Sequence, residues 1–252
     1  MFASNPFALL SEQLPPIVMQ IYVVLMALAV ALGTLIDLHH KRSAEFFALR
    51  RRKARAAAQR QLGSVEIASL VIGTIGREVA TSGEFCQWDR RLSHLLMSYG
   101  FVAYLITTIV LVFCYPTAAH TPIILTALWN AGALMLLIGG AWFFFVLKVN
   151  VAHEGHSPFR LIRADLFVGS LLASVACGLA WHFAQVAQAG IVVSMVLFGI
   201  YIFFTTLLFV SVPWSKFAHM FYKPMAAFQR RVEEADGSSD LPRPADVCNI
   251  RR

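Results

Sequence analysis

Charge is scarce in this sequence. Only 14% of its 252 residues are charged and 58% are hydrophobic, whereas a soluble domain carries about 25% charged residues. No Asp, Glu, Lys or Arg lies in the middle of its long apolar runs. Coupled transporters usually need such a residue near mid-membrane. The composition therefore indicates a membrane protein and argues against a coupled transporter, although a uniporter stays open.

Paired cysteines and a basic leader are also missing. The chain has four cysteines, and none forms the C-x-x-C pair typical of zinc and iron–sulfur sites. We therefore expect neither kind of site in this chain. Residues 1–14 contain no Lys or Arg, so they lack the basic start of a secretory signal peptide.

Five apolar runs are long enough to cross a bilayer, which takes about 20 mostly apolar residues. We therefore predict an all-α fold, an integral membrane bundle of five transmembrane helices. The predicted spans are residues 15–36, 92–114, 123–149, 166–186 and 191–213.

The basic residues orient these spans. Of the 21 Lys and Arg, eleven lie in segment 37–91, three flank the loop between the third and fourth spans, and seven follow Pro213. The segments on the other side, 1–14, 115–122 and 187–190, contain none. The positive-inside rule therefore predicts an outer N-terminus and a cytoplasmic C-terminus. Topology thus explains the net charge of +7 without nucleic acid.

The basic segment 37–91 contains two further helical patterns. Apolar residues recur at helical spacing over 65–79, which predicts a helix lying in the cytoplasmic interface. Residues 42–61 predict a basic helix beside it, whose charge suits either anionic lipid or a soluble partner. We assign residues 1–228 to one membrane domain, and expect the polar tail 229–252 to be disordered or to become ordered only on a partner.

The histidines are the remaining candidates for chemistry. Membrane cytochromes b hold haem between two helices, with one axial imidazole from each at the same depth. His94, early in the second span, and His219, after the fifth, both belong to the cytoplasmic side. Basic side chains around such a pair would attract the anionic haem propionates. The basic residues near this pair are Arg90, Arg91, Lys216 and Lys223.

Other histidines fit simpler interpretations. His120 and His182 share the outer side and form a second candidate haem pair, although His182 beside Trp181 also suits an outer aromatic belt. His39 and His40 end the first span as part of its basic flank. The sequence HEGH at 153–156 is one residue too short for the HExxH zinc motif, and indicates a solvated turn.

Two segments carry a family resemblance. DRRLSH at 89–94, followed by SYGF at 98–101, resembles the second helix of cytochrome b subunits related to the respiratory nitrate reductase gamma subunit. VPWSKFAHMFYKP at 212–224 is similar to the end of the last helix in the membrane part of the quinone-interacting membrane-bound oxidoreductase of sulfate reducers. Similar segments occur in heterodisulfide reductase cytochrome subunits and in tricarballylate-utilisation membrane proteins. The resemblance covers roughly residues 15–228.

The resemblance implies that His94 and His219 ligate one haem b near the cytoplasmic side. It also implies a quinone site and soluble iron–sulfur or flavoprotein partners, with a sulfur-metabolism enzyme such as adenylylsulfate reductase suggested by the nearest relatives. The family's second, outer haem would be ligated at positions that hold Tyr104 and Tyr201 here. Because tyrosine is a poor ligand for low-spin haem b, we predict no outer haem.

A single inner haem cannot carry electrons across the bilayer. We therefore expect quinone to react on the cytoplasmic side, with little charge separation. Side chains near the predicted haem that can donate hydrogen bonds to a quinone are Ser215, Lys216, Tyr222 and Arg91.

Two alternatives to the electron-transfer subunit stay open. One is a haem-free membrane anchor that recruits a soluble reductase through its basic face, so whether the chain itself is catalytic is undecided. The other is a small transporter or channel, which would need a polar path through mid-membrane. The candidates for such a path are Asn130, Thr107, Thr108, Thr205 and Thr206.

Overall fold

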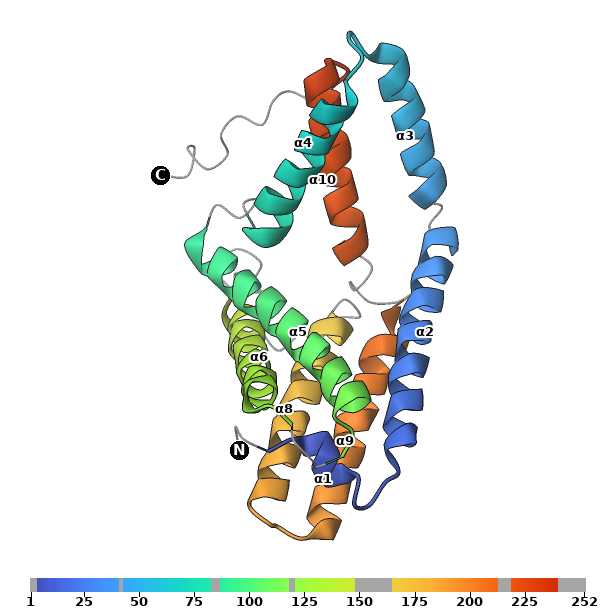
Figure 1. The fold of residues 1–252 in the computed structure, drawn as a ribbon. Coiled ribbons are helices and arrows are strands. Elements are labelled where there is room, and N and C mark those ends of the chain that lie inside the picture. The colour runs from blue at the N-terminus through green and yellow to red at the C-terminus, as the bar shows by residue number, and fades with distance from the viewer. Residues whose placement is uncertain are drawn as a thin grey trace, which may run out of the picture. The chain divides into compact units, whose positions relative to one another are not determined.

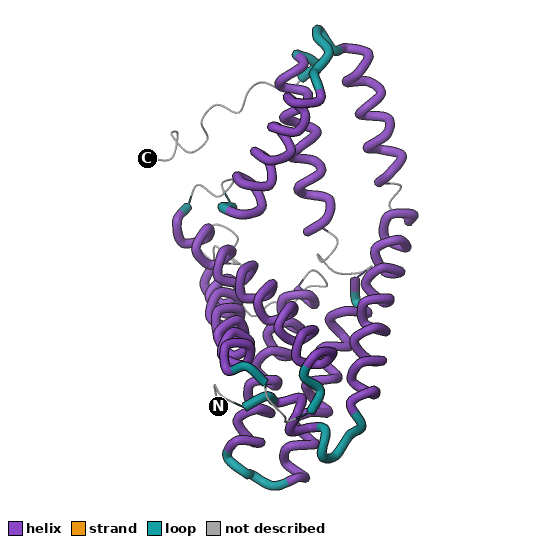
Figure 2. The backbone as a smooth tube through the Cα atoms, in the orientation of Figure 1, coloured by secondary structure: helices purple, strands orange, loops and turns teal. Residues whose placement is uncertain are grey.

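The computed structural model describes residues 4–40, 43–82, 87–117, 121–147, 165–212 and 219–239. Within these ranges every regular element is a helix, as Figure 1 and Figure 2 show. Five helices are long and apolar enough to cross a membrane, which confirms the predicted all-α, five-span architecture of a multi-pass membrane protein. They are Pro16–His40, Trp88–Cys114, Ile123–Leu147, Leu166–Val186 and Ile191–Val210.

The chain divides into two compact units. The first, which we call the bundle unit, comprises Met1–Gly33 and Leu92–Ser215. The second, the basic unit, comprises Thr34–Arg91 and Lys216–Arg252. The boundaries fall within the first span and near the start of the second.

The bundle unit is organised around α8. Of the five spans α8 is the most enclosed, with 56% of its most apolar window buried, against 11% for α2. It packs against α9 along its length and against α6. α6 ends in a π-helical turn, η2 (Phe143–Leu147). The helices that lie in this unit wholly or for most of their length are α1 (Pro6–Leu10), α2 (Pro16–His40), α5 (Trp88–Cys114), α6 (Ile123–Trp142), α8 (Leu166–Val186) and α9 (Ile191–Val210).

Glycines let α5 and α6 approach closely. A Cβ atom on Gly100 would lie 2.6 Å from the backbone nitrogen of Leu136 and 2.8 Å from the carbonyl oxygen of Gly132. A Cβ atom on Gly139 would lie 2.8 Å from the carbonyl oxygen of Ser93. The Ser93 hydroxyl donates to the Gly139 carbonyl at 2.8 Å. Small residues at such crossings are typical of membrane helices, where close packing replaces the hydrophobic effect between helices.

The short helix α1 was not predicted. Asn5 caps it, because its side-chain oxygen accepts from the backbone N–H groups of Phe7 and Ala8. The Asn5 amide also donates to the Tyr115 carbonyl at 2.8 Å, which ties α1 to the end of α5. Phe7, Ala8 and Leu10 are buried, so this segment belongs to the core of the bundle unit.

The basic unit contains α3 (Ser43–Ala57), α4 (Ser64–Thr74), the π-helical turn η1 (Ile75–Ala80) and α10 (His219–Asp236). The two helices predicted in segment 37–91 are therefore present. α4 packs on α10. α10 continues through residues 229–236, which corrects the prediction that the tail is disordered from 229 onward. Residues 240–252 lie outside the described ranges.

The α5–α6 crossing makes Gly100→Ala a sharp test. The added methyl would meet backbone atoms that cannot move alone, so we expect a loss of about 1–3 kcal/mol in the free energy of unfolding. Gly199 on α9 has nothing within 4 Å of its would-be Cβ. Gly199→Ala should therefore be neutral, or stabilising by up to about 1 kcal/mol. The midpoints of unfolding in detergent should be compared for the two variants. Equal midpoints would contradict a close approach of the α5 and α6 backbones at Gly100.

Candidate functional site

His94 lies near the start of α5 and is half-buried. Its Nδ1 atom lies 3.4 Å from the hydroxyl of Ser98, one helical turn further along. Ligating imidazoles are usually oriented by a second hydrogen bond at the nitrogen that does not bind the metal. Were His94 to bind a haem iron through Nε2, the Ser98 hydroxyl could orient its ring in this way.

His219 is the first residue of α10, and its side chain lies outside the described residues. The segment 213–218, which includes Ser215 and Lys216, also lies outside them. His94 belongs to the bundle unit and His219 to the basic unit. Their pairing across a haem therefore stays a prediction from the sequence.

The remaining predicted site residues have definite positions in the basic unit. Arg90 is exposed in the first turn of α5, and Lys223 is exposed on α10. The Arg91 Nε atom donates to the Thr81 carbonyl at 2.8 Å. The Tyr222 hydroxyl donates to the buried carboxylate of Asp37 at 3.2 Å, which links α10 to the last turn of α2. Tyr222 would therefore have to leave Asp37 to donate to a quinone.

A buried polar network occupies the core of the bundle unit. His182 on α8 is fully buried; its Nδ1 lies 3.3 Å from Asn130 Oδ1 and its Nε2 lies 3.0 Å from the Ser4 hydroxyl. The Asn130 amide nitrogen donates to the Thr126 carbonyl at 2.8 Å, which directs its oxygen toward the imidazole. The neutral tautomer with a proton on Nδ1 therefore satisfies the network, by donating to Asn130 and accepting from Ser4.

The interfacial-belt interpretation of Trp181 and His182 is wrong, because both side chains are 0% exposed. Trp181 packs between Phe7 and Tyr201, with ring centroids 5.7 Å and 5.8 Å away. The outer haem pair His120–His182 has one member, His120, outside the described residues. Both ring nitrogens of its other member lie within hydrogen-bond distance of protein groups.

Tyr104 and Tyr201, the two tyrosines for which the resemblance would have implied outer haem ligands, lie close to each other. Tyr104 and Tyr201 are buried, with their hydroxyl oxygens 3.4 Å apart. Tyr104 lies 5.1 Å from the ring of Trp129. A Cβ atom on Gly178 would lie 3.0 Å from the Tyr104 hydroxyl, so a glycine leaves room for this pair. Aromatic rings fill this level of the bundle unit, and the predicted lack of an outer haem stays a prediction.

The polar residues considered for a solute path take part in internal hydrogen bonds. All four threonine hydroxyls donate to a carbonyl one turn back on their own helix, at 2.6–2.8 Å. Thr108 also accepts from the Trp129 indole, and Thr205 lies 2.6 Å from the Ser174 hydroxyl on α8. These bonds account for the mid-span polar groups as contacts within and between helices.

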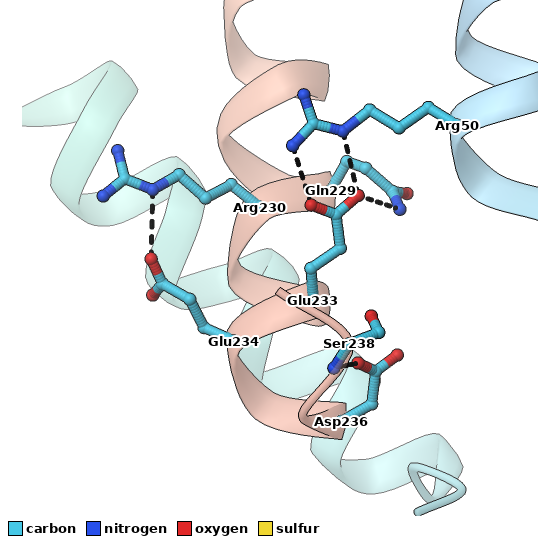
Figure 3. Close-up of polar contacts among 7 residues, drawn as sticks. All are labelled: Arg50, Gln229, Arg230, Glu233, Glu234, Asp236 and Ser238. Atoms are coloured by element: carbon cyan, nitrogen blue, oxygen red, sulfur yellow. Dashed lines mark hydrogen bonds and ion pairs between the residues drawn. The ribbon is translucent and has the colours of Figure 1, made fainter. Parts of the chain in front are cut away.

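A bidentate ion pair holds the basic unit together. Figure 3 shows Arg50 reaching from α3 to Glu233 on α10, with nitrogen–oxygen distances of 2.7 and 3.0 Å. Gln229 donates to the same carboxylate at 3.0 Å. The hydrogen bonds from Arg50 lower the pKa of Glu233 below its ordinary value of 4.5, although burial opposes this effect. Arg230 and Glu234, by contrast, form an exposed pair within α10.

Comparison of the chain with protein-family models, curated proteins and solved structures finds no match. The resemblance to cytochrome b subunits therefore rests on the two sequence segments alone. Across the described ranges, no three side chains of His, Cys, Asp or Glu gather as a metal site would require. A haem needs only two axial ligands, so this finding leaves the haem question open.

Sequence reasoning missed the partners of the buried groups. Asn5 followed by Pro6 is a cap-and-first-turn signal that could have revealed α1. No sequence signal pairs Glu233 with Arg50 or Asp37 with Tyr222, because each pair is far apart in the chain.

We expect His182→Phe to destabilise the bundle unit. An aromatic ring is kept, although it is one atom larger, and the buried Asn130 oxygen loses its donor, which alone costs about 1–3 kcal/mol. Phe183→Leu changes the adjacent residue, which is 61% exposed, and should stay within about 0.5 kcal/mol of wild type. Unfolding in a detergent titration measures both free energies. Equal effects would show that the polar network contributes nothing.

The α3–α10 junction should loosen in acid. Because the pKa of Glu233 is lowered from 4.5, its contribution to stability is complete above pH 4.5 and is lost as the pH falls through the folded-state pKa. We expect hydrogen exchange of α10 amides, corrected for the intrinsic rate, to quicken in that acid range. Glu233→Gln should exchange quickly already at neutral pH, whereas Arg230→Gln should behave as wild type. Identical acid profiles for wild type and Glu233→Gln would refute the assignment.

Proposed function

We propose that this chain is the membrane subunit of a quinone-linked electron-transfer complex, with one haem b held by His94 and His219. The observation that carries the proposal is His94 itself. It is half-buried near the end of a membrane span, its Nδ1 lies near a hydroxyl, and it sits within the segment that resembles the cytochrome b subunits. His219 is the proposed second ligand because it lies in the other segment that resembles these subunits, residues 212–224.

The orientation follows from the division of charge between the units. The described residues of the bundle unit contain no Lys or Arg, whereas the basic unit holds all those of segment 37–91. The positive-inside rule then assigns the basic unit to the cytoplasm and the N-terminus to the outside. The membrane is a bacterial or archaeal cytoplasmic membrane in this proposal.

Haem, when bound, would supply one-electron chemistry between a membrane quinone and a soluble partner. Within the chain, Ser98 would orient the His94 ring. Arg90 precedes His94 by one turn of α5, so helical spacing puts both on the same side of that helix, where Arg90 suits a propionate. Arg91, Lys216 and Lys223 are the other candidates for propionate contacts.

The quinone would react on the cytoplasmic side, where Ser215, Lys216, Tyr222 and Arg91 are candidate hydrogen-bond donors. Of these, Arg91 and Tyr222 already donate to Thr81 and Asp37. Binding a quinone there would exchange one hydrogen bond for another. The soluble partner would be an iron–sulfur or flavoprotein reductase, with adenylylsulfate reductase the example that the resemblance suggests.

A haem-free anchor is the second candidate. The observation that favours it is the basic unit, which forms a compact unit with its own ion pair between α3 and α10. Such a unit could recruit an acidic soluble enzyme through charge alone, without any cofactor in the membrane.

A dithionite-reduced minus oxidised visible spectrum of the purified protein tests the proposal. We expect a b-type α band in wild type that is lost in both His94→Ala and His219→Ala. His40→Ala and His182→Phe, which change an exposed and a fully buried histidine, should keep the band.

If the band were lost in His182→Phe and retained in His94→Ala, the haem would be assigned to the outer side and its ligation by His94 would be refuted. A wild-type spectrum without the band, from protein produced with ample haem, would refute the haem proposal and favour the haem-free anchor.

A further inference from the structure

The basic unit contains a hollow of about 520 Å³. Residues from the last turn of α2, from α3 and from α10 line it, so all of its walls belong to one unit. Apolar and arginine side chains both contribute, and no lining residue is acidic. The lining residues are Leu38, Phe47, Ala48, Arg51, Arg52, Arg55, Tyr222, Met225, Phe228 and Gln229.

Three arginines of this hollow lack a counter-charge. Arg55 follows Arg52 by three residues and Arg51 by four, so helical spacing places it beside both on α3, and all three are exposed. Among the residues that the structure describes, none of them has a hydrogen-bond or ion-pair partner. Their neighbour Arg50 differs, because it pairs with Glu233 on α10. Like charges at this spacing repel one another, so an anion bound between the arginines would reduce this electrostatic repulsion.

We propose that this hollow binds an anionic phospholipid. The phosphate would lie against the three guanidinium groups, which match phosphate oxygens in shape and charge. The upper part of an acyl chain would lie on Leu38, Phe47, Met225 and Phe228.

The occupant follows from two features on the same surface. Leu38 belongs to α2, which is itself a membrane span, so the hollow begins where lipid headgroups lie. A free phosphate would have no use for the apolar wall, on which Met225 is 60% exposed. An acidic protein would need the arginines but not the hollow. The inference does not depend on haem and holds for an electron carrier or an anchor.

Native mass spectrometry of the full chain in detergent can count and rank bound lipids. We expect phosphatidylglycerol to bind more tightly than phosphatidylcholine of the same chain length. Arg51→Gln/Arg52→Gln/Arg55→Gln should weaken phosphatidylglycerol binding on the order of 100-fold, since a basic residue near an anionic surface contributes about fivefold. The control Lys53→Gln/Arg77→Gln/Arg230→Gln removes equal charge from the same unit but away from the hollow, and should have little effect.

Ala48→Trp provides a second variant that keeps every charge. Ala48 is exposed in the lining of the hollow, so the indole should fill it and weaken phosphatidylglycerol binding without harming α3. Equal losses in the two triple variants would indicate diffuse attraction and overturn the proposal. Unchanged lipid binding in Ala48→Trp would also overturn it, as would displacement of the lipid by inorganic phosphate alone. Wild-type affinity in the first triple variant would make an acidic protein the better occupant.

Discussion

A bilayer interior offers no water to a polar group, and this constraint shapes the whole bundle unit. Polar groups in a span are therefore stabilised by partners inside the protein. Among the described residues, the buried Trp181 indole nitrogen is an exception without a hydrogen-bond partner. Thr108, Thr205 and Thr206 each have two such partners, by bonding their own helix and a neighbouring one. Thr206, for example, donates to the Ile202 carbonyl and lies 3.0 Å from the Tyr22 hydroxyl of α2. The few polar residues therefore serve as specific links between helices whose apolar surfaces are otherwise interchangeable.

The same constraint explains where close packing is concentrated. Lipid chains are as apolar as leucine, so helices gain little by hiding leucine from lipid and associate through tight contact instead. The Gly100–Gly132–Gly139 crossing supplies that contact between α5 and α6. α2 has little burial, and its Gln20 and Tyr22 side chains make three hydrogen bonds in the described bundle unit, one to α5 and two to α9. Most of its surface is accordingly not covered by the other described helices.

Hydropathy was enough to predict the five spans, and the run of basic residues predicted the helix α3, because length and composition settle those features locally. Neither signal shows which side chains of a span are buried, so neither could predict the burial of Trp181 and His182. A tryptophan facing a bilayer interface and one in a helix bundle have the same neighbours in sequence. Burial depends on α1, a helix of five residues that is too short for any periodicity to show. The helix beyond residue 229 was not predicted, because the sequence around Glu233 is polar like that of a disordered tail. Only the structure shows that Glu233 pairs with the distant Arg50.

The role of each arginine in the basic unit depends on its partners and not on its residue type. Arg50 and Arg51 are adjacent and chemically identical. Arg50 meets a nearly buried carboxylate and becomes part of the scaffold, with two short hydrogen bonds that a lysine could not reproduce in the same geometry. Arg51 turns toward an apolar hollow that offers no acid. A residue that stabilises the fold and a residue available for a ligand thus follow one another along a single helix.

A membrane subunit with one haem has a different physical task from one with two. Electrons that enter and leave on the same side of the bilayer need no relay through its interior, so that interior can be packed for stability. In the bundle unit, Trp129, Trp181 and the Tyr104–Tyr201 pair fill the core as stacked and edge-on rings. Such a core serves an electron carrier and a haem-free anchor equally well. The difference between these two functions therefore rests on His94 and on the segment that leads to His219, not on the centre of the bundle.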